Sequence, residues 1–548
     1  MLLLEALNVE KRYGPRLLFE LETFRMYSGD RIGLVGANGA GKTTLLSILA
    51  GQLVPDAGTV HCFGVCSFLE QLTVDGREGP ALSKRQAGTF RTGREFESHL
   101  SGGEKTRFRL AEILAEEPDI LLADEPTAHL DLQGIEFLED KLSRFSGALL
   151  VVSHDREFLD SVCEKILEIE AGSFFLYEGG YSKYRQQKEA KTRREKAEYE
   201  QFLKEKRRLE AAVRETRENS HKMRGTPKRM GNSEARLHKR AAGTKKAKLS
   251  RQARGLESRL AHLESKDKPY DSEELRLQWQ NVHRPHSSVL IRAADLSKSF
   301  GEGQLFSGLS FQVFEGDKVA LMGSNGTGKT TLLKMVLRRE STLHIPASLS
   351  IGYFSQELDI LDDSLSLLCN ASKDSGHPES LIRSVLGRLG FRREAVFQQV
   401  AMLSGGERVK LCLAKLLLQP NNLLLLDEPS NFLDLETQEA LEKLLLDYPG
   451  TILFATHDRR LIREVAQKLV ILEGSRSRFF QGSMAELHEK RMHRDGDVHA
   501  ERMVVENRLA EITGRLSMPG AGDDVEALDK EFKVLVARRR ELESKGRR

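Results

Sequence analysis

The stretch GLVGANGAGKTTLL, residues 33–46, decides the fold. It has the pattern of a phosphate-binding loop, in which glycines turn backbone N–H groups inward at the start of a helix. In such a loop the lysine reaches the β- and γ-phosphates of a nucleotide, and the following hydroxyl ligates Mg²⁺. The apolar segment RIGLVG leads into the loop and TTLL follows it, which is the strand–loop–helix context that the pattern requires. The sequence therefore predicts an α/β nucleotide-binding domain.

The chain contains this domain twice. ALMGSNGTGKTTLL occupies 320–333, and three further segments recur: LSGGEKTRFRLAEIL as LSGGERVKLCLAKLL, DILLADEPTAHLDL as NLLLLDEPSNFLDL, and LLVVSHDREFL as ILFATHDRRLI. The offset is 287 residues at the loop lysines and 303 residues at the later segments. This constancy indicates a duplicated domain with an insertion in the second copy. We expect the two domains at 1–185 and 287–484.

A basic segment lies between the copies, at 186–286. Residues 191–260 carry 23 Lys or Arg against 9 Asp or Glu, a net charge of +14, although the whole chain of 548 residues has a formal charge of only +3. Apolar residues recur at helical spacing on both sides of the turn RGTPKRMGN. These are Tyr199, Phe202, Leu209 and Val213, then Leu249, Ala253, Leu256, Leu260 and Leu263. The pattern predicts a helical hairpin with arms of about 30 residues, or about 45 Å.

Residues 485–548 show a second pair of apolar stripes around the turn MPGAGDD. One stripe is Val505, Leu509, Ile512 and Leu516, and the other is Val525, Leu528, Phe532 and Leu535. We expect a C-terminal helical hairpin there.

The rest of the composition limits the class of protein. No run of about 18 apolar residues is present, and the N-terminal stretch MLLLEALNVEKRYG lacks a basic region ahead of its apolar residues. We therefore expect neither a membrane span nor a signal peptide. Five cysteines, with only Cys62 and Cys66 close together, favour reduced structural thiols over a zinc site. These features predict a cytoplasmic protein.

Acidic residues end an apolar strand in both copies. ILLAD ends at Asp124 and LLLLD at Asp427, where each carboxylate is placed to hold Mg²⁺. Glu125 and Glu428 follow directly, so on a strand they point the other way and can orient or deprotonate the attacking water. A carboxylate that only caps a strand end is the alternative. His154 and His457 also end apolar strands, and their recurrence at one offset favours contact with the γ-phosphate over a structural role.

Two LSGGE segments, with the loops, acids and histidines in this order, resemble ATP-binding cassette proteins. In that family two cassettes close head to tail, and each ATP lies between the phosphate loop of one cassette and the LSGGE signature of the other. The resemblance implies two α/β cassettes joined by the helical hairpin, with ATP and Mg²⁺ as cofactors. It also implies a monomer whose two cassettes form an intramolecular dimer.

The resemblance assigns roles residue by residue. Catalysis falls to Glu125, Glu428, His154 and His457, so both sites should hydrolyse ATP. The first site joins Tyr13, Gly36, Asn38, Gly39, Gly41, Lys42, Thr43, Thr44, Gln71 and Asp124 to Ser404, Gly405, Gly406 and Glu407. The second joins Phe300, Gly323, Asn325, Gly326, Gly328, Lys329, Thr330, Thr331, Gln356 and Asp427 to Ser101, Gly102, Gly103 and Glu104. The implied Mg²⁺ ligands are Thr43, Gln71, Asp124, Thr330, Gln356 and Asp427. Tyr13 and Phe300 would stack on adenine, and a buried core aromatic is the alternative for both.

Tandem cassettes with a helical linker and no membrane segment resemble the ABC-F group, which acts on the ribosome. Its members typically carry DEPTNHLD, from which Ala128 and Phe432 depart here. The acids, with Asp131 and Asp434, are kept, so we expect catalysis to be intact and coupling between the cassettes to be altered.

The resemblance also implies a partner for the basic hairpin. In the ABC-F group this linker enters the ribosomal exit site and lies along transfer RNA, with its tip near the peptidyl-transferase centre. Lys and Arg side chains would neutralise RNA phosphates there. A solvated coiled coil that only spaces the cassettes is the alternative. The expected partners are the bacterial ribosome, its RNA and exit-site or P-site tRNA, and the tip candidates are Met223, Arg224, Lys228, Arg229 and Met230.

Three functions remain open at this point. The segment PKRMGNSEARLHKR and the C-terminal hairpin resemble antibiotic-resistance members from Gram-positive bacteria, which displace lincosamides, streptogramin A or pleuromutilins from the peptidyl-transferase centre. A housekeeping translation factor that regulates elongation or rescues stalled ribosomes is the second reading. An ATPase for DNA repair, or the detached subunit of a transporter, is the third. The first is the prediction.

Overall fold

The chain forms two compact units, Met1–Leu176 with Arg276–Arg548, and Tyr177–Leu275. The computed structural model describes residues 1–70, 90, 102–128, 130–222, 232–263, 288–300, 303–355, 360–391, 393–473, 477–490, 505–509, 512–513 and 525–546.

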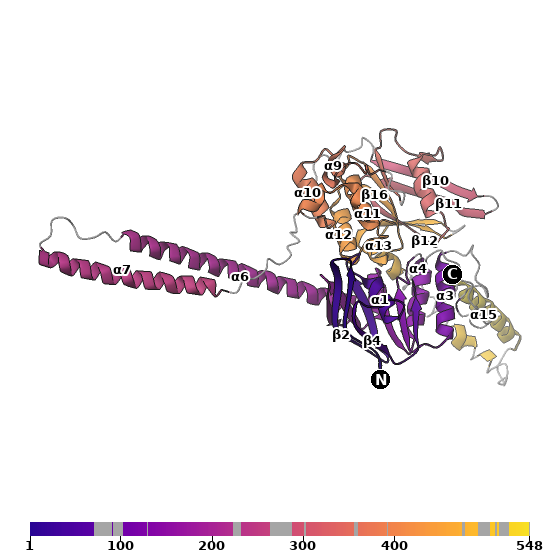
Figure 1. Cartoon of the computed structure of the whole chain (residues 1–548). Helices are drawn as coiled ribbons and strands as arrows, with labels where there is room; N and C mark the ends of the chain where they lie inside the picture. The colour runs from indigo at the N-terminus through magenta and orange to yellow at the C-terminus, as the bar shows by residue number, and fades with distance from the viewer. Residues whose placement is uncertain are drawn as a thin grey trace. The chain divides into compact units, whose positions relative to one another are not determined.

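The first copy of the repeat is built on a sheet in the order β5-β6-β7-β3-β8-β9, which is parallel from β5 to β8. Helices of this copy lie beside its strands (Figure 1). Apolar runs such as ILLAD and ALLVV are buried on both faces of this sheet, as parallel strands covered by helices require. The sheet strands are β3 (Arg31–Gly36), β5 (Cys66–Leu69), β6 (Ile120–Asp124), β7 (Ala148–Val152), β8 (Lys165–Glu170) and β9 (Ser173–Glu178). The helices of this copy are α1 (Lys42–Leu49), α3 (Gly102–Ala115), α4 (Leu132–Ser143) and α5 (Arg156–Val162).

The second copy repeats this sheet in the order β14-β15-β16-β12-β17-β18. Its strands are β12 (Lys318–Gly323), β14 (Ile351–Phe354), β15 (Leu423–Asp427), β16 (Thr451–Ala455), β17 (Lys468–Leu472) and β18 (Arg478–Phe480). Its helices are α8 (Lys329–Leu337), α9 (Leu367–Ser372), α10 (Glu379–Arg388), α11 (Gly405–Leu418), α12 (Leu435–Asp447) and α13 (Arg459–Val465), with 3-10 turns η1 (Arg393–Phe397) and η2 (Val400–Met402). The predicted fold class is confirmed.

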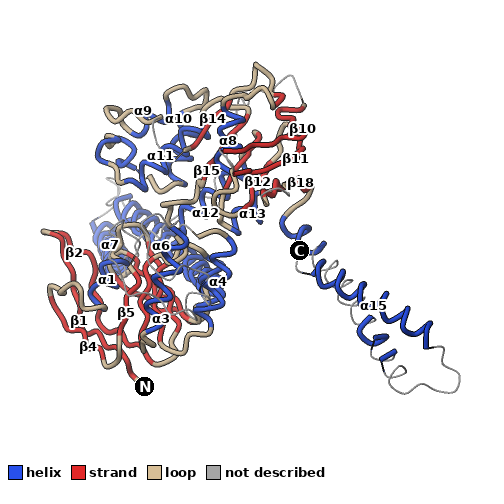
Figure 2. Tube along the Cα trace, turned by 90° about the vertical axis from the view of Figure 1, so that its right-hand side faces the viewer, coloured by secondary structure: helices blue, strands red, loops and turns tan. Residues whose placement is uncertain are grey.

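Each copy also has a three-stranded antiparallel sheet. The first contains β1 (Leu2–Tyr13), β2 (Arg16–Tyr27) and β4 (Ala57–Cys62), and the second contains β10 (Val289–Phe300), β11 (Gly303–Phe314) and β13 (Leu343–His344). In the second copy, α9, α10 and α11 gather at the β14 edge of the parallel sheet, and β10 and β11 lie at the opposite, β18 edge (Figure 2).

The strand order explains where the functional segments meet. β6, β7 and β3 are neighbours in the first sheet, as β15, β16 and β12 are in the second. Both pairings in each sheet are parallel, so the carboxyl ends that carry the acid, the histidine and the phosphate loop share one edge of the sheet. Ligands of open parallel sheets bind at such an edge.

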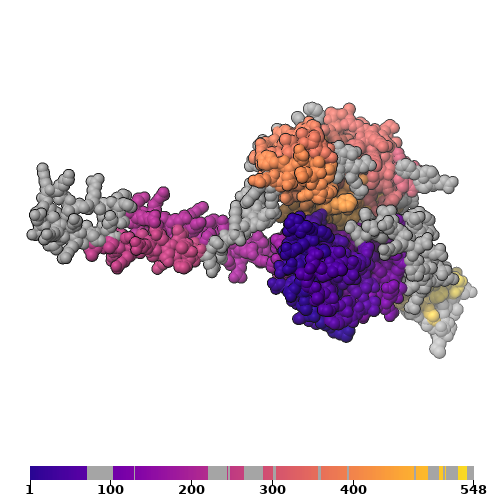
Figure 3. Space-filling model, in the orientation of Figure 1, coloured from indigo at the N-terminus to yellow at the C-terminus, as the bar shows by residue number. Residues whose placement is uncertain are grey.

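The second unit is a helical hairpin of α6 (Tyr181–Lys222) and α7 (Asn232–Ala261), whose arms lie against each other (Figure 3). The predicted seam is present: its members are buried or half-buried, with Leu209 and Ala253 most enclosed. Arg217 pairs with Glu257 across the arms at 2.8 Å. The first arm is longer than predicted, 42 residues, because the helix begins at Tyr181 and continues through the segment before the seam.

The C-terminal segment contains α15 (Val525–Gly546), and residues 505–509 and 512–513 are also helical. Val505 and Leu509 pack against Phe532, Leu535 and Val536, and Ile512 is fully buried, so both predicted stripes contribute to the contact. Leu516 and the side chains of Val525 and Leu528 lie outside the described residues. None of the described helices is both long enough and apolar enough to cross a bilayer.

Candidate nucleotide-binding sites

Both phosphate loops run from a buried strand into a helix, as the sequence predicts. β3 leads to α1 in the first copy and β12 leads to α8 in the second. Each helix is N-capped by a glycine in the left-handed region, Gly41 with φ 100° and Gly328 with φ 97°. A Cβ atom on Gly41 would lie 2.8 Å from the Leu18 side chain, so the position needs glycine for both its backbone and its packing.

The loop lysines fold back over the carbonyl groups of their own loops. Lys42 Nζ donates to the Gly36 carbonyl at 2.8 Å and to the Ala37 carbonyl at 3.1 Å. Lys329 Nζ makes the matching bonds to Gly323 at 2.7 Å and to Ser324 at 3.1 Å. Burial lowers the pKa of both ammonium groups, and nearby carboxylates oppose this shift. Each lysine therefore holds a partly desolvated positive charge at the mouth of its loop.

A hydroxyl and a carboxylate meet beside each loop. Thr330 Oγ1 donates to Asp427 Oδ1 at 3.2 Å, and the Thr43 hydroxyl forms the same bond with Asp124. The second oxygen of Asp124 is buried and has no hydrogen-bond partner among the described residues. Such a pair of oxygen donors fits Mg²⁺, which uses one or two protein ligands and completes its shell with water and phosphate oxygens.

The glutamates after the strands are oriented by the backbone and not by strand alternation. β6 and β15 end at the aspartates, and Glu125 and Glu428 both adopt φ 49°, the left-handed region that non-glycine residues rarely occupy. The sequence-based reason for their direction was therefore wrong, although both carboxylates do turn toward the histidines. Strained backbone repeated at the same position of both copies is typical of functional sites.

The two histidines have different contacts. His154 Nε2 lies 3.1 Å from Glu125 Oε1, and the His154 N–H donates to Glu125 Oε2 at 3.2 Å. His457 Nε2 lies 3.5 Å from Glu428 Oε1, and it also lies 3.0 Å from Lys329 Nζ and 2.9 Å from Asn325 Oδ1. Burial and the Lys329 charge lower the pKa of His457 to about 4, so this imidazole is neutral at pH 7.

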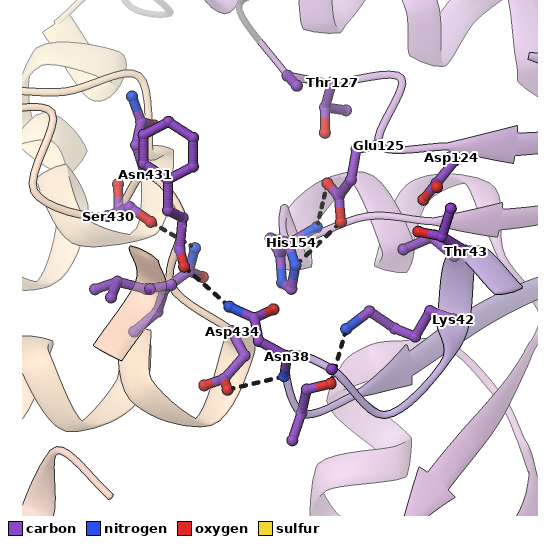
Figure 4. A pocket seen from close by; sticks show the side chains of 18 of the residues that line it. Asn38, Lys42, Thr43, Asp124, Glu125, Thr127, His154, Ser430, Asn431 and Asp434 are labelled. Carbon is purple, nitrogen blue, oxygen red and sulfur yellow. Dashed lines mark hydrogen bonds and ion pairs between the residues drawn. The ribbon is translucent and has the colours of Figure 1, made fainter. Parts of the chain in front are cut away.

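A pocket of about 1310 Å³ contains residues of both copies. Lys42, Thr43, Asp124, Glu125 and His154 line it from the first copy, opposite Asp434 and its neighbours of the second (Figure 4).

Asn38 joins the two walls of this pocket. Its side-chain Nδ2 donates to the Phe432 carbonyl at 2.9 Å, and its backbone N–H donates to Asp434 Oδ2 at 3.2 Å. A Cβ atom on Gly406 would lie 3.4 Å from Asn38 Nδ2, so the second LSGGE segment reaches the first phosphate loop.

The LSGGE segments themselves start helices. In the second copy Ser404 caps α11 and forms a capping box with Glu407, and Gly405 and Gly406 open the helix. Ser404, Gly406 and Glu407 line the pocket described above. In the first copy Gly102 and Gly103 open α3, with Glu104 in its first turn.

Other predicted residues divide into those that the structure places and those that it does not. Tyr13 is 59% exposed and lines the same pocket, so it is not a core aromatic. Gly39 and Thr44 also line the pocket, while Gly326 and Thr331 hold the equivalent positions at α8. Outside the described residues lie Gln71, Ser101, Gln356, the side chain of Phe300, and the tip candidates Met223, Arg224, Lys228, Arg229 and Met230.

Two arginines were missed by the sequence reasoning. Arg156 and Arg459 follow the His-Asp pair in each copy and form ion pairs with Glu442 and Glu139 of the other copy. Their repetition at the same offset as the histidines was the available signal.

Comparison with known proteins identifies the family to which the chain belongs. The family model described as ABC transporter matches residues 21–67, 80–128 and 306–431. The erythromycin resistance ATP-binding protein MsrA of Staphylococcus epidermidis is 34% identical over 86% of this chain and 95% of its own length. The ribosome protection protein VmlR of Bacillus subtilis is 32% identical over 99% of this chain and 98% of its own. The chain belongs to the ABC-F family. It is an ATP-binding cassette ATPase with two cassettes.

Two further comparisons broaden this result. The ATP-binding protein Uup of Caulobacter vibrioides is 33% identical over 84% of this chain and 76% of its own. An archaeal ribosome recycling factor, solved with a ribosomal stalk protein, has a TM-score of 0.59 at 21% identity and covers 89% of this chain and 92% of its own, which supports the fold alone.

Proposed function

We propose that this ATPase binds bacterial ribosomes and displaces antibiotics from the peptidyl-transferase centre. The observation that carries the proposal is the match to VmlR, which spans 99% of this chain and therefore includes the hairpin and the C-terminal helices as well as the cassettes. MsrA, an erythromycin resistance protein by name, is a second resistance-type relative. ATP closes the cassettes, the closed form binds in the exit site, and hydrolysis releases the protein.

The charge of the hairpin supports an RNA partner. Lys204, Lys206, Arg207 and Arg208 are exposed within little more than one turn of α6. Cations at this density on a long helix can follow an RNA backbone, because each contact with a phosphate releases bound counterions. The tip, which includes Met223, Arg224, Lys228, Arg229 and Met230, would act nearest the drug. Binding of this kind should weaken steeply with salt.

The proposed chemistry uses the residues of the two sites in matching roles. Lys42 and Lys329 bind the β- and γ-phosphates, and Tyr13 stacks on adenine in the first site. Thr43 with Asp124, and Thr330 with Asp427, would hold Mg²⁺, which would neutralise phosphate charge. Glu125 and Glu428 orient the attacking water, while His154 and His457 contact the γ-phosphate.

The test uses the double substitution Glu125→Gln and Glu428→Gln, which should trap the ATP-bound closed state. We expect this variant to co-sediment with ribosomes in ATP but not in ADP, to dissociate at high salt, and to release a bound pleuromutilin, lincosamide or macrolide. Changing Lys204, Lys206, Arg207 and Arg208 to Gln in the otherwise unchanged chain should leave its ATPase activity unchanged. The same four changes in the trapped double variant should reduce the salt dependence of its binding to ribosomes.

The alternative is a housekeeping translation factor, and the similarity to Uup favours it. Binding that leaves the drug in place would support this alternative. No ATP-dependent binding to ribosomes would overturn both.

A further inference from the structure

Among the arginine–glutamate pairs that connect the cassettes in the described part of the chain, two are related by the repeat, whereas Arg463–Glu157, at 2.7 Å, is not one of these two. Arg156 opens α5 of the first cassette, and Arg459 opens α13 of the second, 303 residues later. Their partners, Glu442 on α12 and Glu139 on α4, are separated by the same 303 residues. The duplication has therefore kept both ends of a contact that exists only between copies.

The geometry of the first pair is bidentate and buried. Arg156 Nη1 donates to Glu442 Oε2 at 3.1 Å, and Arg156 Nη2 donates to Oε1 at 2.5 Å. The side chains are only 2% and 8% exposed. Arg459 Nη1 lies 3.1 and 3.4 Å from the two oxygens of Glu139, and this pair is 16% and 18% exposed. The parallel fork of a bidentate arginine fixes direction as well as distance.

Each pair joins the two walls of one nucleotide site. Arg156 lies two residues after His154, and Glu442 lies on the helix whose N-cap, Asp434, accepts the backbone N–H of Asn38. In the second site Arg459 lies two residues after His457, and Glu139 lies on the helix capped by Asp131. A shift of either helix along the cassette interface would therefore also move the segment that carries the histidine.

We propose that Arg156 and Arg459 are positioning residues for ATP hydrolysis. Each pair holds the histidine-bearing segment of one cassette against the helix that begins at the opposing aspartate, so that closure on ATP brings the histidine and the catalytic glutamate of that site into register. The inference concerns turnover and not ribosome binding, so it stands or falls independently of the proposed function.

The experiment measures each site separately. Site 1 is isolated by Glu428→Gln and site 2 by Glu125→Gln, and turnover is measured as phosphate release while affinity is measured with a fluorescent ATP analogue. Glu442→Gln should lower kcat of site 1 at least tenfold with affinity unchanged within twofold. Glu139→Gln should lower kcat of site 2 in the same way. Its partner Arg459 is more exposed than Arg156 and therefore tolerates the loss of the carboxylate.

Two further variants distinguish positioning from simple loss of stability. Asp447→Asn breaks the Arg388–Asp447 bond of 2.9 Å at the end of the same helix α12, but within one cassette, so it should leave kcat within twofold of its parent. The swap Arg156→Glu with Glu442→Arg should recover most of the turnover that Glu442→Gln loses. The proposal is overturned if both Gln variants keep their kcat, if affinity falls as much as kcat, or if the folded swap variant stays as inactive as Glu442→Gln.

Discussion

His154 and His457 occupy the same position of the two nucleotide sites, yet their surroundings differ. His457 Nε2 lies 3.0 Å from Lys329 Nζ and 2.9 Å from Asn325 Oδ1 of its own phosphate loop, and burial with the Lys329 charge lowers its pKa to about 4. His154 Nε2 lies 3.1 Å from Glu125 Oε1. The difference teaches that two sites of one sequence pattern can hold their histidines in different ways.

The two glutamates also differ. Glu125 Oε1 lies 3.1 Å from His154 Nε2, whereas Glu428 Oε1 lies 3.5 Å from His457 Nε2, and desolvation raises the pKa of Glu428 to about 7. The ion pair beside the first site is the more buried of the two. From the greater burial of this ion pair we infer that the first site is held together more tightly, and the following substitutions test this inequality.

The largest effect is expected for the catalytic glutamates. Glu125→Gln with Glu428→Gln should reduce steady-state phosphate release by about 10²- to 10⁴-fold, since the proposed base of both sites is lost. Glu428→Gln alone, which leaves the bridged first site intact, should retain more activity than Glu125→Gln alone. Equal activities for the two single variants would contradict the inequality.

A smaller effect concerns charge at the cassette interface. Burial, with the Asp458 carboxylate nearby, raises the pKa of Asp155 to about 6, and Glu139 adds to this while Arg459 opposes it. Because the folded pKa lies above the ordinary value of about 3.9, the folded state takes up the proton first. Its contribution to stability is full below about pH 4 and is lost as the pH rises through 6.

Asp155→Asn keeps the cap that Asp155 provides to α5 and removes the charge. The variant should therefore gain about 1–2 kcal/mol in free energy of unfolding at pH 7.5, and little at pH 4. Urea unfolding followed by circular dichroism at both pH values measures this. Asp458→Asn, at the equivalent cap of α13, should lower the pKa of Asp155 and so move the loss of stability to lower pH. If the pH profile of the unfolding free energy is unchanged in both variants, Asp155 is not the group that titrates.

Much of this organisation could be predicted from the sequence, because the segments that carry it are local. The loop from Gly36 to Thr43, the acid that ends β6 and the hairpin seam each follow from spacing within a short window. The repeat also predicted that two copies share one fold. What the sequence could not supply is contact between copies: the direction of Glu125 depends on a left-handed backbone, and the choice of partner for Asn38 or Arg156 depends on how two surfaces meet.

Asn38 allows a direct test of the contact between the cassettes. Asn38→Ala removes one hydrogen bond between the cassettes, worth about 1 kcal/mol or roughly a fivefold change in the closed population. Ser384→Ala is the control, and it should change closure by less than twofold because it removes a hydrogen bond within one cassette, from Ser384 Oγ to the Ser380 carbonyl at 2.8 Å. ATP-induced closure is measured by energy transfer between dyes, one on each cassette. Similar losses for both variants would mean that the bond from Asn38 does not hold the cassettes together in solution.

The smallest effect is expected at Phe432, where this chain departs from the histidine typical of its family. Phe432 adopts φ 64° and its side chain is 60% exposed, while its carbonyl carries the bond to Asn38. Phe432→His should therefore leave turnover within about twofold, since the contact uses the backbone and histidine tolerates positive φ better than phenylalanine does. A change of more than fivefold in turnover at the first site, with the second unaffected, would show that the ring itself sets the distance between the cassettes.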